Sequence, residues 1–168
     1  MNPTKISTAK LKTSSEHVFY EIWMFLAIIK KLAVMPKEPK CIFCKNVYLE
    51  SFVIHLRNLL NFFYTSSNNR KKDDILAEDF LKDVKKFKKE RTSYSQMSYT
   101  KTRIDKQAAH LTYHRSRYNK RTKLWQFAKL HSQLYPIIVA FYECLPNSFR
   151  NWLYFKELKK VIDTFQNI

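Results

Sequence analysis

The sequence contains no glycine, although glycine makes up about 7% of an average protein. Glycine supplies the positive φ angles and the close backbone approach that phosphate-binding loops, Rossmann fingerprints and tight β-hairpins require. Its absence excludes these features and favours an all-helical protein.

Long hydrophobic runs are also absent. The longest extends from Ile22 to Ile29, whereas a helix that spans a bilayer needs about 20 apolar residues. The first fifteen residues, MNPTKISTAKLKTSS, are polar and basic and do not form a signal-peptide pattern. We therefore expect a cytoplasmic protein with no membrane partner.

Cysteine is scarce. Cys41 and Cys44 form a single C-x-x-C motif and Cys144 stands alone. A four-ligand zinc site would need a second pair, and a thioredoxin-like redox motif would need a βαβ context. The pattern predicts three ordinary thiols, no metal site and no cofactor.

Acidic residues are few: 14 Asp and Glu face 31 Lys and Arg, giving a formal net charge of +17. Only Lys5, Lys10 and Lys12 fall in the first fifteen residues, so the charge belongs to the folded part of the chain. This excess indicates a polyanionic partner, with nucleic acid favoured over an anionic membrane surface. The alternative is a lysine-rich surface that serves solubility alone.

Apolar residues recur at helical spacing along most of the chain, whose 168 residues suit one domain. We predict a flexible basic arm over residues 1–14 and a single all-α helical bundle over residues 15–168. Four to five main helices are expected, over residues 15–33, 45–64, 103–117, 123–145 and from Asn147 or Ser148 onward. One or two short helices are expected within residues 75–90, and loops over residues 65–74 and 91–102.

The stretch RIDKQAAHLTYHRSR, residues 103–117, carries the candidate site. In a helix, Arg103 and His110 lie two turns apart on one face. Lys106, Gln107, His114 and Arg117 extend that face, while Ile104, Ala108 and Leu111 form the opposite, core-facing stripe. The helix is thus predicted to pack by one side and to present a cationic, titratable row on the other.

A basic segment follows this helix. RSRYNKRTK, residues 115–123, combines five cations with Tyr118, a mixture that suits single-stranded nucleic acid because phosphates pair with cations and bases stack on aromatic rings. The predicted nucleic-acid contacts are Lys106, Gln107, His114, Arg115, Arg117, Lys120, Arg121 and Lys123.

The helix predicted over residues 45–64 could support the site. Glu50 and Arg57 lie two turns apart on one face of it. Arg57 would be a second phosphate ligand if it were free, and a structural residue if it were paired with a carboxylate. His55 points elsewhere and is expected to be a satisfied, partly buried polar group.

Four segments together resemble a family of small bacterial all-helical proteins: EHVFYEIWMFLA, LESFVIHLRNLLNFFY, DDILAEDF and RIDKQAAHLTYHR. The likeness covers about residues 16–145. That family is in turn similar to the HEPN superfamily, in which helical bundles carry an Arg, four to six residues, then a His; here Arg103 and His110 match with six residues between them.

The resemblance implies metal-independent RNA cleavage in a site formed by two subunits, and so a homodimer that could be a toxin or defence component with an antitoxin or other protein partner. His110 would move protons at the ribose 2′-hydroxyl or the leaving 5′-oxygen, and Arg103 would hold the scissile phosphate. Two alternatives stay open. The chain could be a non-catalytic RNA- or DNA-binding module, or an accessory subunit in which HLTYHR is a buried polar network.

Overall fold

The computed structural model describes residues 6–36, 40–91, 93–106, 113 and 125–166. Within these residues all regular structure is helical, which confirms the all-α prediction. The α-helices are α1 (Thr8–Ala33), α2 (Ile42–Tyr64), α3 (Val84–Glu90), α4 (Tyr94–Ile104), α5 (Phe127–Glu143), α6 (Asn147–Arg150) and α7 (Leu153–Thr164), and the 3-10 turns are η1 (Ser67–Asn69) and η2 (Ala77–Asp79).

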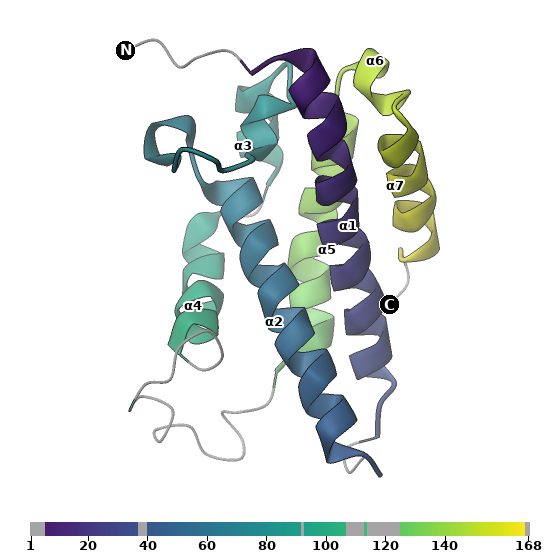
Figure 1. The fold of residues 1–168 in the computed structure, drawn as a ribbon. Coiled ribbons are helices and arrows are strands. Elements are labelled where there is room, and N and C mark those ends of the chain that lie inside the picture. The colour runs from purple at the N-terminus through teal and green to yellow at the C-terminus, as the bar shows by residue number, and fades with distance from the viewer. Residues whose placement is uncertain (1–5, 37–39, 92, 107–112, 114–124, 167–168) are drawn as a thin grey trace.

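The helices pack around α1, α2 and α5 (Figure 1). α1 contacts α2, α5 and α7, while α4 packs against α2 and α3 against α5. The first and last helices of the described chain therefore lie side by side, and α4 forms the opposite flank of the bundle.

The core is rich in phenylalanine. Phe141 of α5 is fully buried, and its ring lies 5.2 to 6.4 Å from five other phenylalanine rings. These rings belong to Phe62 and Phe63 of α2, Phe80 directly after η2, Phe87 of α3 and Phe155 of α7. One residue of α5 thus contacts three other helices and the residue that follows η2.

Helix α1 begins earlier than predicted. It starts at Thr8, and Ser7 caps it by accepting a hydrogen bond from the Lys10 amide (3.3 Å). Leu11 is only 6% exposed. The prediction of a flexible arm to residue 14 is therefore wrong from Thr8 onward, because the apolar stripe of α1 extends to Leu11, one turn before the predicted start of the helix.

The segment predicted as a loop over residues 91–102 forms most of α4. Its sequence is polar, but Met97, Thr100 and Ile104 are buried at i, i+3 and i+7 and make a narrow stripe against α2. The α-helix ends at Ile104. The prediction that a helix starts at Arg103 is therefore wrong, because Arg103 lies in the last turn of α4. Residues 107–117 of the predicted helix fall outside the described residues, apart from Tyr113.

The number of helices also differs from the four to five predicted. The described residues hold seven α-helices, two of which, α3 and α6, are shorter than eight residues. The predicted last helix is divided into α6 and α7, and Pro146 rather than Asn147 or Ser148 occupies the N-cap of α6. The short helices within residues 75–90 are confirmed as η2 and α3.

Arg91 joins the C-terminal end of α2 to α3. Its guanidinium donates to the Phe63 carbonyl and lies over the Tyr64 ring, 4.8 Å from the centroid. A cation at a helix C-terminus satisfies a free carbonyl and favours the helix dipole. Burial raises the pKa of the Tyr64 hydroxyl to about 12, although the Arg91 charge acts in the opposite direction.

Helix α7 is held at its C-terminal end by two residues of α5. The Tyr135 hydroxyl donates to the Ile162 carbonyl (2.9 Å), and the His131 ring stacks on the Tyr135 ring with centroids 5.1 Å apart. His131 is only 5% exposed, and burial lowers its pKa while a hydrogen bond with the Phe165 backbone raises it. These contacts satisfy carbonyls at the α7 C-terminus that the helix itself cannot.

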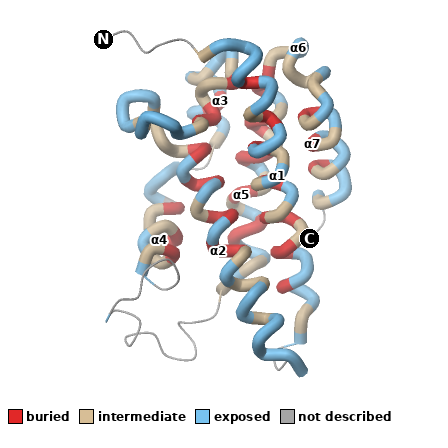
Figure 2. The backbone as a smooth tube through the Cα atoms, in the orientation of Figure 1, coloured by how far each residue is buried: buried red, intermediate tan, exposed pale blue. Residues whose placement is uncertain are grey.

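The N-terminal part of α2 projects beyond the core. None of the residues from Cys41 to Ser51 is buried, whereas eight residues between Phe52 and Phe63 are (Figure 2). Ile42 is 70% exposed and Phe43 is 77% exposed. No described helix is long and apolar enough to cross a membrane.

Candidate nucleic-acid interface

Arg103 lies in the last turn of α4, where its neighbour Ile104 is fully buried against the core. The Ile104 anchor directs the Arg103 side chain toward the start of α5. There the guanidinium lies over the Trp125 ring, with its Cζ 4.0 Å from the ring centroid. Such a contact contributes about 0.5 to 1 kcal/mol when partly exposed, and it fixes the plane of the guanidinium.

Trp125 is itself held by the core. The Trp125 ring packs edge-on against the Phe52 ring of α2, with centroids 5.9 Å apart. The Phe127 ring also packs edge-on against the Phe52 ring, at 5.2 Å. Phe52 is fully buried. A chain of contacts therefore runs from the core of α2 through Trp125 to Arg103, so that the position of Arg103 depends on packing rather than on a surface rotamer.

Arg57 of α2 lies beside the end of α4. Its Nε is 3.3 Å from Oδ1 of Asp105, and both side chains are partly exposed. Asp105 Oδ1 is buried and accepts no well-formed hydrogen bond within the described residues, so its contact with Arg57 is mainly ionic. Of the two alternatives for Arg57, a free phosphate ligand or a carboxylate-paired residue, the structure shows the second.

The charge around this end of the bundle remains positive. Lys101 lies in the last turn of α4, and Lys106 is the second residue after the helix and is exposed. Asp105 is the single acidic residue between Arg91 and Lys129 in the sequence. We call the group of Arg57, Lys101, Arg103 and Lys106, with Asp105 among them, the α4 basic end.

Most of the predicted site residues fall outside the described residues. These are Gln107, His110, His114, Arg115, Arg117, Lys120, Arg121 and Lys123. Of the others, Arg57, Arg103 and Lys106 come together at the α4 basic end, whereas Glu50 is an exposed residue of α2 two turns before Arg57.

His55 is a partnered core residue, as predicted. It is 6% exposed, and its Nδ1 lies 2.7 Å from Oε2 of Glu21 on α1. Glu21 also lines a cavity of about 260 Å³ between α1, α2 and the segment around Asp74. A second cavity, of about 470 Å³, lies between α3 and the start of α6. Arg103 lines neither of these two cavities.

Lys101 of the α4 basic end was not among the predicted site residues, and two contacts of this group were not anticipated from the sequence. Trp125 is 22 positions from Arg103, and no local pattern signals a contact between them. Asp105 is adjacent to the predicted row, and its pairing with Arg57 depends on how α4 crosses α2. Both contacts are tertiary.

Comparison with known proteins finds no family model that matches the sequence, and neither a curated protein nor a solved structure matches it. The assignment of a function therefore depends on the residues themselves.

Proposed function

We propose that this protein is a cytoplasmic RNA-binding protein that holds single-stranded RNA on the α4 basic end and the adjoining basic segment 115–123. The observation that carries the proposal is the net charge of +17, which a chain of 168 residues maintains against its own self-repulsion. A polyanion relieves that repulsion when it binds, and it releases counterions as it does so.

The geometry at Arg103 and Trp125 supports this choice of surface. Arg103 and Trp125 flank the sequence 104–124, and their contact brings the two ends of that stretch together. Segment 115–123, with its five cations, falls between these two residues in the sequence, and we include it in the proposed RNA-binding region. Cations next to aromatic rings are the usual composition of surfaces that bind single-stranded RNA.

Binding is tested by fluorescence anisotropy with a labelled single-stranded RNA and a duplex of the same sequence. We expect tighter binding to the single strand and a steep loss of affinity with salt. The variant Arg115→Gln/Arg117→Gln should weaken binding and flatten its salt dependence. A matched control, Lys10→Gln/Lys12→Gln, removes the same charge from the first turns of α1 and should change affinity much less. Equal losses in both variants would mean that net charge alone governs binding and that this surface has no special role.

A second candidate function is metal-independent RNA cleavage, favoured by the Arg103 and His110 spacing. Arg103 would stabilise the charge that develops on the scissile phosphate, and His110 would transfer the proton. Under this proposal a homodimer supplies a second histidine, so that acid and base are separate residues.

Cleavage is tested with cellular RNA in EDTA, followed by analysis of the products for 2′,3′-cyclic phosphate ends. Native protein should cleave, and His110→Ala should not, while its RNA affinity and melting temperature stay close to native. His17→Ala, which removes an exposed histidine of α1, is the matched control and should cleave normally. RNA binding by the native protein without any product would leave the binding proposal standing and refute the catalytic one.

A further inference from the structure

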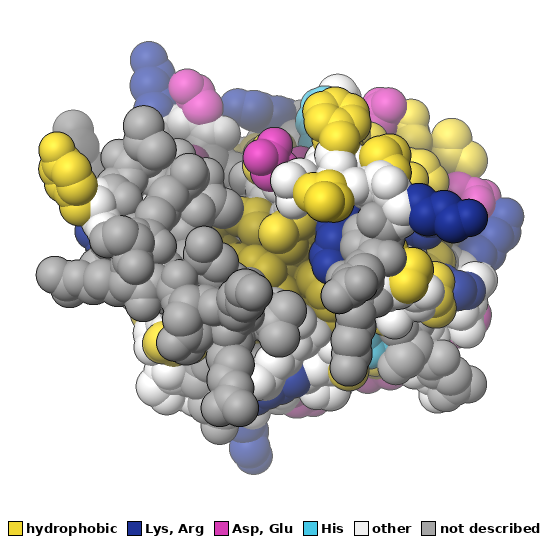
Figure 3. All heavy atoms as spheres, turned by 90° about the horizontal axis from the view of Figure 1, so that it is seen from below, with side chains coloured by type: hydrophobic (Ala, Val, Ile, Leu, Met, Phe, Trp, Pro, Cys, Tyr) yellow, Lys and Arg dark blue, Asp and Glu magenta, His cyan; other side chains and the backbone are white. Residues whose placement is uncertain are grey.

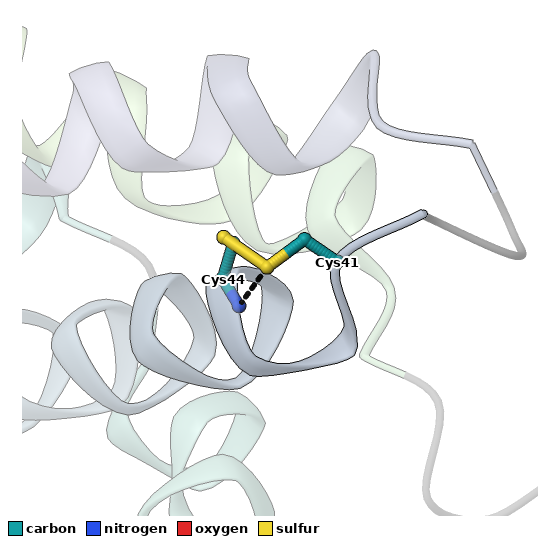
Figure 4. Close-up of a disulfide and its surroundings, with 2 residues drawn as sticks. All are labelled: Cys41 and Cys44. Atoms are coloured by element: carbon teal, nitrogen blue, oxygen red, sulfur yellow. Dashed lines mark hydrogen bonds between the residues drawn. A yellow bond between two sulfur atoms is a disulfide. The ribbon is translucent and has the colours of Figure 1, made fainter.

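The sequence motif Cys41-Ile42-Phe43-Cys44 forms a disulfide at the start of α2 (Figure 4). This corrects the prediction that both cysteines are ordinary thiols. Cys41 is the N-cap residue of the helix, Cys44 lies in its first turn, and their Cα atoms are 5.3 Å apart. Both cysteines are exposed. We propose that Cys41 and Cys44 are a redox-active pair that exchanges disulfides with external thiols, with Cys41 as the attacking thiol.

The first argument is the surroundings of the Cys41 sulfur. The backbone N–H of Cys44 donates to Cys41 Sγ at 3.0 Å (Figure 4). When the pair is reduced, this N–H and the positive end of a 23-residue helix favour a thiolate at Cys41. The first turn of α2 contains no acidic residue, and Lys40 precedes Cys41 directly. Every described charge next to Cys41 along the chain therefore favours the anion that attacks disulfides.

The second argument is that this disulfide is poorly placed to stabilise the fold. The stabilisation that a disulfide confers increases with the length of the loop that it closes, and here the cysteines are three residues apart. All four residues from Cys41 to Cys44 are exposed, so none of them belongs to the buried core. Opening the bond should therefore leave the core of the bundle unchanged.

The third argument is access. The pair lies at the projecting end of α2, on the side of the molecule that Figure 3 views, where hydrophobic and basic side chains are interspersed. Ile42 and Phe43, between the two cysteines, are 70% and 77% exposed. An external disulfide can reach either sulfur, and the apolar pair offers a contact for the side chains around a peptide disulfide.

The exchange balances without any further reagent. The Cys41 thiolate attacks one sulfur of an external disulfide, the external S–S bond breaks, and one external thiolate leaves and takes a proton from water. Cys44 then loses its proton to water and attacks Cys41 Sγ, which expels the second thiolate and forms the bond between Cys41 and Cys44. The protein is oxidised by two electrons and the external disulfide is reduced to two thiols.

The first test compares the reactivity of the two thiols. In reduced protein at about pH 6, Cys41 in the Cys44→Ser variant should react with iodoacetamide at least about tenfold faster than Cys44 in Cys41→Ser. Cys144 is an internal control, because burial and the nearby Glu90 carboxylate raise the pKa of its thiol. Equal rates for Cys41 and Cys44 would overturn the assignment of Cys41.

The second test traps the intermediate and identifies the source of the external disulfide. Cys44→Ser should accumulate a mixed disulfide on Cys41, detected by mass spectrometry, with oxidised glutathione and with a disulfide-bonded peptide. Ile42→Ser/Phe43→Ser should slow only the peptide reaction if the natural partner is a protein, and neither reaction if it is a small thiol. Ile54→Ser, an exposed apolar residue further along α2, is the matched control. Absence of any mixed disulfide would overturn the proposal.

The third test addresses a purely structural disulfide. Reduction of the native protein should lower its melting temperature by no more than about 8 °C and leave its helical circular dichroism unchanged. Unfolding on reduction would overturn the proposal. The redox tests use no RNA, so their outcome is independent of the proposed RNA binding.

Discussion

Replacing Asp105 by Asn should strengthen RNA binding, because it releases Arg57 from the ion pair at the α4 basic end. Both side chains are partly exposed, 41% for Arg57 and 33% for Asp105, so the pair contributes only about 0.2 to 1 kcal/mol to stability. The substitution is isosteric. It should therefore leave the fold intact and lower the melting temperature by no more than about 4 °C.

The size of the gain follows from counterion release. One additional phosphate contact on a single strand steepens the slope of log affinity against log salt by about 0.7. Relative to 1 M salt, this corresponds to about a fivefold gain in affinity at 0.1 M. Fluorescence anisotropy at four or five salt concentrations would measure both the affinity and the slope.

The matched control is Asp163→Asn, which changes the net charge equally but releases Lys159 on α7, away from the α4 basic end. It should give a smaller gain and leave the slope nearly native. The double variant Arg57→Gln/Asp105→Asn should lose the gain of Asp105→Asn. A slope that is the same in native protein, Asp105→Asn and Asp163→Asn would refute the location of RNA beside Arg57.

Three further predictions concern stability and ionisation. Phe141→Ala should lower the free energy of unfolding by about 3 to 5 kcal/mol in a denaturant titration, because it empties the centre of the aromatic core. Burial lowers the pKa of His131, so its stabilising contribution should be complete above about pH 6.5 and decline as the pH falls further; His131→Gln should reduce this dependence in melting curves. The pKa of Tyr64 is raised to about 12, so stability should decline as the pH rises from about 10 toward that value. In an ultraviolet titration Tyr64→Phe should remove an ionisation near pH 12, and the matched control Tyr99→Phe, a change of an exposed side chain, should leave that ionisation in place.

The long helices were predictable because each buries a broad apolar stripe. In α1, Val18, Ile22, Phe25 and Ile29 are all at most 4% exposed, as their spacing indicates. A stripe of this width still predicts a helix when the predicted boundary is wrong by a few residues. The sequence therefore determines the all-α class and most of α1, α2, α5 and α7.

Helix α4 was not predictable by the same means. Among the α4 residues whose burial the structure describes, the buried stripe consists of Met97, Thr100 and Ile104, set among serine, tyrosine and threonine residues that are also typical of loops. The helix is stabilised mainly by its packing on α2, which no local pattern reveals. A similar limit applied at Cys41 and Cys44, because a C-x-x-C motif without neighbouring strands does not show whether it starts a helix.

The candidate site was predictable only as a set of charges. Arg103 and Lys106 were recognised from their spacing, but the pairing of Arg57 with Asp105 and the stacking of Arg103 on Trp125 join residues 48 and 22 positions apart. The direction of a surface arginine depends on which neighbours the tertiary fold provides. Sequence spacing therefore identified Arg103 and Lys106 as candidate site residues, but it did not identify the side chains that Arg57 and Arg103 contact.

The packing of α1 against α7 has a consequence for biosynthesis. About 120 residues separate the end of α1 from the start of α7, which corresponds to roughly 6 to 24 s of translation. During that time the side of α1 that α7 will cover remains exposed, although α2 can already pack on another side. The nascent chain thus carries an uncovered apolar surface until α7 has left the ribosome, and we expect chaperones that bind such surfaces to associate with it in this interval.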